Sequence, residues 1–214
     1  NSSLLYIGGG TPNLLKAEEI CELLSFLREF VDVKDVGMEG NPFEFTPEYL
    51  EKIADAGVTK ISMGVETFQS NTLKAVKRAK ANERLIGKIV CEAKRLGISI
   101  NIDLMVGLPQ QTFEGCLKDA ETIISIGPDQ VTIYPYLKIP SAMADLSMDS
   151  HDMFRIIESA WKVFKENGYR RDSIWVFSKS HQIYDSAKDE LVYDYFGLGP
   201  AAFSTYRSIQ TVNP

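Results

Sequence analysis

The sequence contains few of the residues that build cross-links and metal sites. Of its 214 residues, three are cysteine and two are histidine. Cys21, Cys91 and Cys116 are odd in number, lie far apart and fall in stretches with helical patterning. We therefore expect core thiols of a reducing compartment rather than a disulfide set or a metal site. His151 and His181 are also too far apart to form a ligand pair on one helix.

Long apolar runs and an excess of positive charge are also absent. No stretch approaches the roughly 18 apolar residues of a membrane span, and the first residues carry no signal-peptide pattern. The net charge of −6 and the pI near 5.1 disfavour nucleic acid as a main partner. A hydrophobic content of 44% is ordinary for a globular protein with a sizeable core. We expect a cytoplasmic protein with neither a membrane span nor a nucleic-acid partner.

What the sequence does contain is a repeated alternation of strand and helix patterns. Short apolar runs and two-residue alternation predict strands, and apolar residues at helical spacing predict helices. The expected strands cover residues 4–7, 36–42, 60–68, 99–109 and 130–137. The expected helices cover residues 14–30, 47–57, 71–80, 82–97, 113–127 and 151–169. This order favours a parallel sheet, either open or closed into a barrel.

A glycine-rich stretch, YIGGGTPNLL at residues 6–15, follows the first expected strand. Three consecutive glycines indicate a place where the chain turns sharply or where a ligand approaches the backbone. The stretch is not a phosphate loop, since no Lys-Ser or Lys-Thr pair follows at the required spacing. It is not the dinucleotide fingerprint either, because its glycines are adjacent. A strand-to-helix turn without a ligand stays open as the simpler interpretation.

Three expected strands carry a carboxylate at or near their carboxyl ends. In KISMGVE, Glu66 lies on the face opposite the apolar residues, and in SINIDLMV Asp103 does the same. Glu39 comes just before the turn that closes the second expected strand. Strands buried on both faces are apolar throughout, so these acids either form ion pairs at the rim or mark a ligand site. Together with the glycine turn they favour a ligand site, since parallel sheets bind ligands at this end.

Six motifs occur in this sequence in the same order as in one known family, which the chain therefore resembles. They are YIGGGTPNLL, MEGNP, SMGVETF followed by Arg78, NIDLMVGLPQQT, IYPYLKIP and YFGLGPAAFST. Over nearly its whole length the chain is similar to the oxygen-independent coproporphyrinogen III oxidases and their relatives, within the radical S-adenosylmethionine (SAM) superfamily. The resemblance implies an α/β fold, a partial (β/α)6 TIM-like barrel of which the first strand and the C-terminal domain are missing. Residues 1–140 would form the second to sixth barrel strands, and residues 141–214 the last barrel helix and the start of the C-terminal region.

The resemblance also implies which residues bind SAM. The turn formed by Gly9, Gly10, Thr11 and Pro12 would meet the amino group of the SAM methionine beside a [4Fe-4S] cluster. Three side chains would make further contacts with SAM, those of Glu39, Arg78 and Asp103. The Arg78 guanidinium suits a carboxylate, and the Asp103 carboxylate suits ribose hydroxyls. The backbone around Tyr134 and Pro135 would lie near adenine. Glu66 stands where the family has glutamine, so it would accept hydrogen bonds but donate none.

One family feature is absent from this sequence, the C-x-x-x-C-x-x-C loop that ligates the cluster. Three thiolates on one loop leave the fourth iron free for SAM, and the three dispersed cysteines do not reproduce this arrangement. We therefore expect the cluster cysteines upstream of this chain, no metal ligands within it, and no activity from this piece alone. The chain would then be the middle portion of a longer protein, with a natural homologue that has lost its cluster as the alternative.

The activity implied by the resemblance is oxidative decarboxylation of porphyrinogen propionates through a 5′-deoxyadenosyl radical, in haem biosynthesis. A haem chaperone of the same family, a related methyltransferase and a haem-degrading enzyme stay open as alternatives. The expected partners are a tetrapyrrole or similar substrate and an electron donor for the cluster. Apolar surface for a flat macrocycle would come from side chains that follow the last expected barrel strand in the sequence. These are Met143, Met148, Phe196 and Phe203. Ordinary packing under a loop is the competing interpretation of these four.

Overall fold

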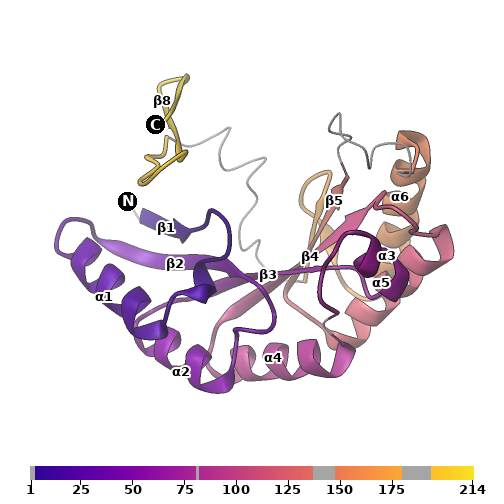
Figure 1. The fold of residues 1–214 in the computed structure, drawn as a ribbon, viewed down its shortest axis with the longest axis horizontal. Coiled ribbons are helices and arrows are strands. Elements are labelled where there is room, and N and C mark those ends of the chain that lie inside the picture. Colours follow the sequence, from indigo (N-terminus) through magenta and orange to yellow (C-terminus); the bar gives the residue numbers. More distant parts are fainter. Residues whose placement is uncertain (1–2, 81, 137–147, 180–193) are drawn as a thin grey trace.

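The computed structural model describes residues 3–80, 82–136, 148–179 and 194–214, and its main feature is one curved sheet (Figure 1). Seven strands form this sheet in the order β1-β2-β3-β4-β5-β7-β6. The first five are parallel to one another, and they are β1 (Ser3–Ile7), β2 (Val33–Gly40), β3 (Lys60–Glu66), β4 (Ser99–Val106) and β5 (Gln130–Pro135). The sheet is open rather than closed, so the α/β, barrel-like fold that was expected is confirmed as a partial barrel.

Helices follow the parallel strands and lie along the outer, convex side of the sheet (Figure 1). The helices are α1 (Ala17–Arg28), α2 (Pro47–Asp55), α3 (Ser70–Ala75), α4 (Glu83–Arg95), α5 (Phe113–Ile126) and α6 (Ser150–Glu166). A short 3-10 helix, η1 (Pro12–Leu14), follows the glycine turn. All strands and helices that the sequence predicts are present in the described residues.

Local chemistry explains where the longer helices begin and end. The side chains that cap α2, α4 and α5 are Thr46, Asn82 and Thr112, and each accepts a hydrogen bond from a backbone N–H of the first turn. After α2, Gly57 adopts a left-handed conformation with φ +88°, and the N–H of Val58 donates to the carbonyl of Ile53 at 2.9 Å. This arrangement ends the helix and turns the chain back toward the next strand.

The main core lies between the convex face of the sheet and the helices. Met63 from β3 and Ile100 and Ile102 from β4 are fully buried there, with no exposed surface. Ile86 of α4 and Ile123 of α5 are equally buried against them. Burial of apolar area at about 25 cal/mol per Å² makes this layer the main stabilising part of the fold.

Three features of the described structure were not expected. Beyond β5 the sheet continues with two short antiparallel strands, β7 (Val176–Ser178) and β6 (Arg170–Arg171). A separate hairpin of β8 (Phe203–Tyr206) and β9 (Ile209–Val212) follows. Helix α3 ends at Ala75 rather than near residue 80, because Lys77 adopts a left-handed conformation with φ +56°. Strands of two to four residues carry too little pattern to be recognised locally.

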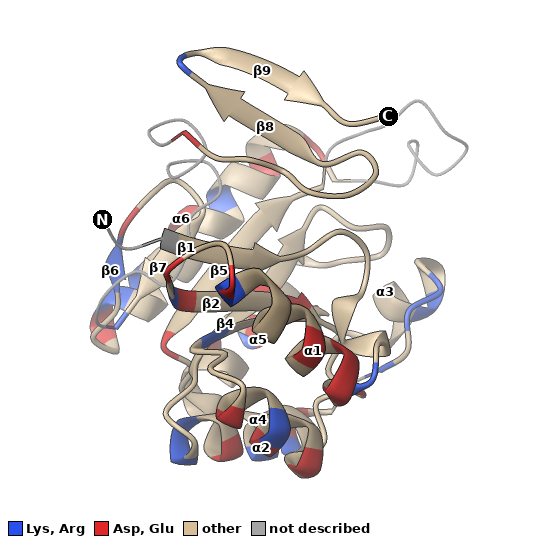
Figure 2. Cartoon of the chain, turned by 90° about the vertical axis from the view of Figure 1, so that its left-hand side faces the viewer, with Lys and Arg blue, Asp and Glu red and all other residues tan. Residues whose placement is uncertain are grey.

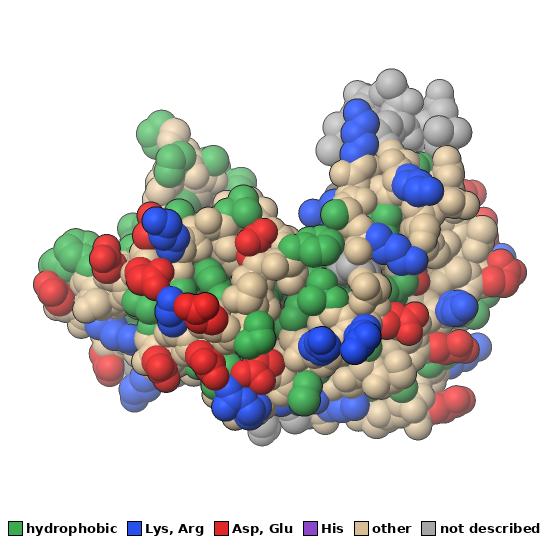
Figure 3. All heavy atoms as spheres, turned by 60° about the horizontal axis from the view of Figure 1, so that its bottom comes forward, with side chains coloured by type: hydrophobic (Ala, Val, Ile, Leu, Met, Phe, Trp, Pro, Cys, Tyr) green, Lys and Arg blue, Asp and Glu red, His purple; other side chains and the backbone are tan. Residues whose placement is uncertain are grey.

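The charged residues are distributed unevenly over the surface. Acidic residues are prominent on α1 and basic residues around α3 (Figure 2), whereas side chains of both signs are interspersed over the outer helices (Figure 3). Within the described part of the chain, no helix combines the length and the apolar character that crossing a membrane requires.

Candidate functional site

The concave face of the sheet carries polar side chains, from residues that alternate along the strands with the apolar residues of the convex face. Glu39 of β2 pairs with Ser62 of β3, and Ser62 pairs in turn with Asn101 of β4. Asp103 lies one pleat further along β4, opposite Gly64. Because residues two apart share a face, these side chains all project from the concave face toward the carboxyl ends of the strands. We call this region the carboxyl edge.

The glycine turn after β1 is open on one side and tied to β2 on the other. Gly9 and Gly10 have φ values of +86° and +94°, which residues with a side chain rarely adopt. No atom lies within 4 Å of the position that a Cβ would take at either glycine, so the backbone there faces open space. The N–H of Gly9 donates to Oε1 of Glu39 at 2.8 Å. The Glu39 carboxylate therefore links the glycine turn to β2, and we call this pair the Gly9–Glu39 unit.

A buried amide behind the turn fixes its position. Asn13 is 2% exposed, and its Nδ2 donates to the carbonyl of Asn41 at 2.8 Å while its Oδ1 accepts from the N–H of Asn41 at 3.0 Å. A Cβ at Gly40 would lie 2.3 Å from the Asn13 side chain, so glycine is required at this position. Pro12 is buried at the start of η1, and the Thr11 side chain makes no capping hydrogen bond to this helix. Sequence reasoning missed Asn13, whose partner lies 28 residues away.

Asp103 is held by a network of neighbouring polar side chains. Its Oδ2 accepts from the Ser62 hydroxyl at 2.6 Å, and its Oδ1 accepts from Asn101 Nδ2 at 2.7 Å. Asn101 in turn accepts from the Thr132 hydroxyl of β5 at 3.0 Å. Burial raises the pKa of Asp103 to about 6, a shift that these hydrogen bonds oppose and that the charges of Glu66 and Glu39 increase. The three predicted carboxylates are therefore close enough to influence one another.

Tyr6 adds a phenol to the same face. Burial raises its pKa above the ordinary value, and the nearby charges of Glu39 and Asp103 raise it further, while a hydrogen bond with Ser62 lowers it. Its ring lies across β2, where a Cβ at Gly37 would come within 2.7 Å of it. Tyr6, Ser62 and Asn101 were not predicted as site residues, although strand parity places them beside Glu39 and Asp103.

Glu66 and Arg78 form an ion pair at the end of β3. Glu66 has φ +66°, a conformation that is uncommon for a residue with a side chain and that occurs at functional turns. The N–H of Arg78 donates to the carbonyl of Leu73 at 2.8 Å, as the left-handed Lys77 reverses the chain after α3. The early end of α3 is therefore what returns Arg78 to Glu66.

The end of β5 completes the carboxyl edge. Pro135 pairs with Val106 of β4, and the N–H of Tyr136 donates to the Val106 carbonyl at 2.7 Å. Tyr134 is 39% exposed and close enough to Tyr6 to influence its pKa. The backbone at residues 134–136 is thus ordered at the side of the site opposite the glycine turn.

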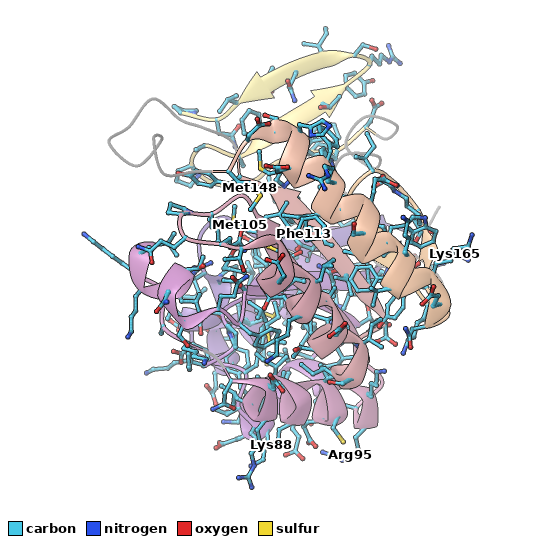
Figure 4. The ribbon with its side chains drawn as sticks, turned by 90° about the vertical axis from the view of Figure 1, so that its right-hand side faces the viewer. Lys88, Arg95, Met105, Phe113, Met148 and Lys165 are labelled. Atoms are coloured by element: carbon cyan, nitrogen blue, oxygen red, sulfur yellow. The ribbon has the colours of Figure 1, made fainter. Side chains whose placement is uncertain are left out.

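The residues expected to form apolar surface near the site differ in their placement. Met148 packs against the core, and its N–H donates to the carbonyl of Gly107 at 3.3 Å, just beyond Met105 (Figure 4). Phe196 and Phe203 are 73% and 52% exposed. Met143 and His181 lie outside the described residues.

The cysteines do not form a metal site in the part of the chain that the structure describes. No group of three or more His, Cys, Asp or Glu side chains there could hold a metal ion. Cys21, Cys91 and Cys116 lie on three different helices, α1, α4 and α5. The expectation of core thiols is correct for Cys116, which is buried, and wrong for Cys91, which is exposed, because Cys91 faces outward from α4.

The family model for the radical SAM superfamily matches residues 2–123. The chain belongs to the radical SAM superfamily. Enzymes of this superfamily use SAM and a [4Fe-4S] cluster, so the cofactor prediction is confirmed at the level of the family. The open turn, the carboxylates and the guanidinium at the carboxyl edge fit SAM, whereas the described cysteines do not fit a cluster.

Individual relatives show what the chain resembles more closely. It is 28% identical over 207 residues to a protein named heme chaperone HemW from Buchnera aphidicola, covering 93% of this chain and 55% of the relative. It is 29% identical over 187 residues to the oxygen-independent coproporphyrinogen III oxidase of Helicobacter pylori, covering 82% and 41%. The fold matches the solved structure of coproporphyrinogen III oxidase (HemN) from Escherichia coli, with a TM-score of 0.81 and 24% identity over 94% of this chain and 52% of that one. The chain spans about half the length of the curated relatives it matches.

Proposed function

We propose that the carboxyl edge binds SAM and that the protein containing this chain is a radical SAM enzyme of tetrapyrrole metabolism. The observation that carries the proposal is the convergence of the Gly9–Glu39 unit, the Glu66–Arg78 pair and the Asp103 network on one face of the sheet. The turn's open backbone suits an amino group that must approach closely. SAM, when bound with its cluster, supplies radical chemistry, and the residues of this chain bind and orient it.

Each group at the edge has a chemistry that suits one part of SAM. The Arg78 guanidinium has five N–H donors, so it can keep Glu66 as a partner and still receive a carboxylate. Asp103 presents carboxylate oxygens that accept from ribose hydroxyls, and its neighbours already hold it in place. The ordered backbone at Tyr134 and Pro135 offers groups for adenine at the far side. Glu39 positions the glycine turn through the Gly9 N–H.

The test is SAM affinity in the full-length, cluster-loaded protein. Arg78→Ala and Asp103→Asn should each weaken SAM binding about ten- to hundred-fold, because losing a charged hydrogen-bond partner costs on the order of 1.5–3 kcal/mol. Glu121→Ala is the matched control, because Glu121 is an exposed acid on α5, away from the carboxyl edge. If all three variants bind SAM like the unchanged protein, the site assignment is wrong.

For the substrate, we propose the oxidative decarboxylation of a porphyrinogen, as in the oxidase relatives. The open face of a partial barrel leaves room for a flat macrocycle, and Phe196 and Phe203 offer exposed apolar surface. Haem chaperoning is the second candidate, favoured by the longer match to the protein named heme chaperone HemW, 93% of this chain against 82% for the oxidase.

These two activities differ in what the full-length protein does to a tetrapyrrole. A decarboxylated product formed together with 5′-deoxyadenosine supports the oxidase. Tight haem binding without turnover supports the chaperone. A methylated product would point to the methyltransferase relatives, and ring opening of haem to the haem-degrading ones. Absence of affinity for any porphyrin or porphyrinogen would contradict both candidates.

A further inference from the structure

A buried carboxylate on α5 contacts the segment that follows β3. Asp119 is 4% exposed, and its partners are three consecutive residues about 50 positions earlier in the chain. The Thr67 hydroxyl donates to Oδ2 at 2.5 Å, and the Gln69 side-chain amide donates to the same oxygen at 3.2 Å. The N–H of Phe68 donates to Oδ1 at 3.1 Å. Both carboxylate oxygens are therefore occupied by one short segment.

Gln69 strengthens this attachment by reaching along the first turn of α5. Its Oε1 accepts from the N–H of Thr112 at 3.3 Å. A Cβ at Gly115 would lie 2.2 Å from that same oxygen, so the glycine makes room for the amide. Thr67 also closes the segment on itself, because its hydroxyl oxygen accepts from the N–H of Gln69 at 3.1 Å. Residues 67–69 are thus bound to α5 at several points.

The energetics of this contact suggest that it serves more than packing. Burial raises the pKa of Asp119, while its hydrogen bonds from Thr67, Gln69 and the Phe68 backbone lower it. Among the described residues it has no ion-pair partner. A buried carboxylate is costly unless its hydrogen bonds are well made, and apolar residues could fill the same space at lower cost.

The segment that Asp119 holds begins immediately after Glu66. The N–H of Thr67 donates to the carbonyl of Val65 at 2.8 Å. This hydrogen bond closes a tight turn around Glu66, whose φ is +66°. A conformation of this kind persists only when the surrounding structure holds it. The same segment leads directly into α3, whose end presents Arg78 to Glu66.

We propose that Asp119 is the positioning residue for the Glu66–Arg78 pair. It holds residues 67–69 on α5, and so it sets where Glu66 and, through α3, Arg78 face the carboxyl edge. Asp119 itself does not touch the ligand. The effect on SAM rests on the proposed function, whereas the effect on the geometry of the segment does not.

The experiment compares Asp119 with a second aspartate that anchors backbone at the opposite end of the sheet. Asp129 accepts from the N–H of Ile100 at 3.0 Å, at the amino ends of β4 and β5. Asp119→Ala and Asp129→Ala each remove an anchoring carboxylate, and only the first lies behind the proposed site. Both are measured in the full-length, cluster-loaded protein by SAM affinity and by hydrogen exchange of the Phe68 and Gln69 amides.

We expect Asp119→Ala to weaken SAM binding about ten-fold and to speed exchange at Phe68 and Gln69 by a similar factor. Asp129→Ala should leave both unchanged. If Asp119→Ala does not fold, Thr67→Val removes one donor at nearly constant volume and should act in the same direction. Equal behaviour of the Asp119 or Thr67 variant and the Asp129 variant in both measurements would overturn the inference. Faster exchange with SAM affinity insensitive even to Arg78→Ala would support the positioning role and contradict the proposed SAM site instead.

Discussion

The two faces of the β1–β5 sheet are made by alternate residues of the same strands, yet they differ in nearly every property. On the convex face Ile100 and Ile102 of β4 are fully buried under helices. On the concave face the intervening Asn101 and the following Asp103 form hydrogen bonds with Ser62 and with each other. One face is apolar and covered, and the other is polar, with Asp103 accessible in part.

This difference shows how a partial barrel separates stability from chemistry. Burial of apolar area on the convex face stabilises the fold without any requirement for exact chemical groups. On the concave face carboxylates are buried close together, which costs free energy, as the raised pKa of Asp103 indicates. Substitutions on the two faces should therefore produce different kinds of defect.

The largest expected effect is on the convex face. Ile102→Ala should lower the free energy of unfolding by about 2–5 kcal/mol, because it leaves a cavity in the core under α4 and α5. Urea unfolding followed by circular dichroism measures it. Ser62→Ala, on the concave side of the neighbouring strand, should cost only about 1 kcal/mol. Equal losses in the two variants would contradict the division between the faces.

The next comparison is between two glycines, Gly37 in strand β2 and Gly87 in helix α4 on the convex side of the sheet. Gly37→Ala should destabilise the protein by about 1–3 kcal/mol, because the new Cβ would lie 2.7 Å from the Tyr6 ring. Gly87 lies inside α4, and no atom lies within 4 Å of the position that a Cβ would take there, so Gly87→Ala should stabilise by about 0.5–1 kcal/mol. Thermal unfolding of the two variants checks the opposite signs. A gain of stability in Gly37→Ala would show that the Tyr6 ring is free to move.

The third effect is the pH dependence that Asp103 imposes. Its pKa in the folded protein is about 6, above the ordinary value of 3.8, so the fold favours the protonated form. Between about pH 4 and pH 6 the unfolded chain releases this proton first, and the contribution of Asp103 to stability falls as pH rises through that window. The loss should be on the order of 1–2 kcal/mol.

Asp103→Asn isolates this contribution, because asparagine does not titrate. The difference in unfolding free energy between the unchanged protein and this variant should change between pH 4 and pH 6 and stay level above pH 7. A difference that is flat over the whole range would show that Asp103 titrates at its ordinary pKa. The same carboxylate accepts hydroxyl hydrogen bonds better when ionised, so SAM affinity should rise through pH 6.

Much of this molecule follows from local patterns in the sequence. The strand and helix order, the parity that sets Glu39 and Asp103 apart from their apolar neighbours, and the glycine turn are all readable there, since each depends on residues a few positions apart. The family motifs depend on the same short spacings. The positions of Thr46 and Gly57 at the ends of α2 are equally local.

Only the tertiary structure decided which of these groups meet. It tied Gly9 to Glu39 across 30 residues and Asn13 to Asn41 across 28, and it brought Asp119 to Thr67 across 52. Such contacts depend on how whole helices pack on the sheet, and no local spacing encodes them. The short β7 and β6 strands formed for the same reason, because β7 pairs with the exposed edge of β5 and β6 pairs in turn with β7, and two or three residues alone could not supply these backbone partners.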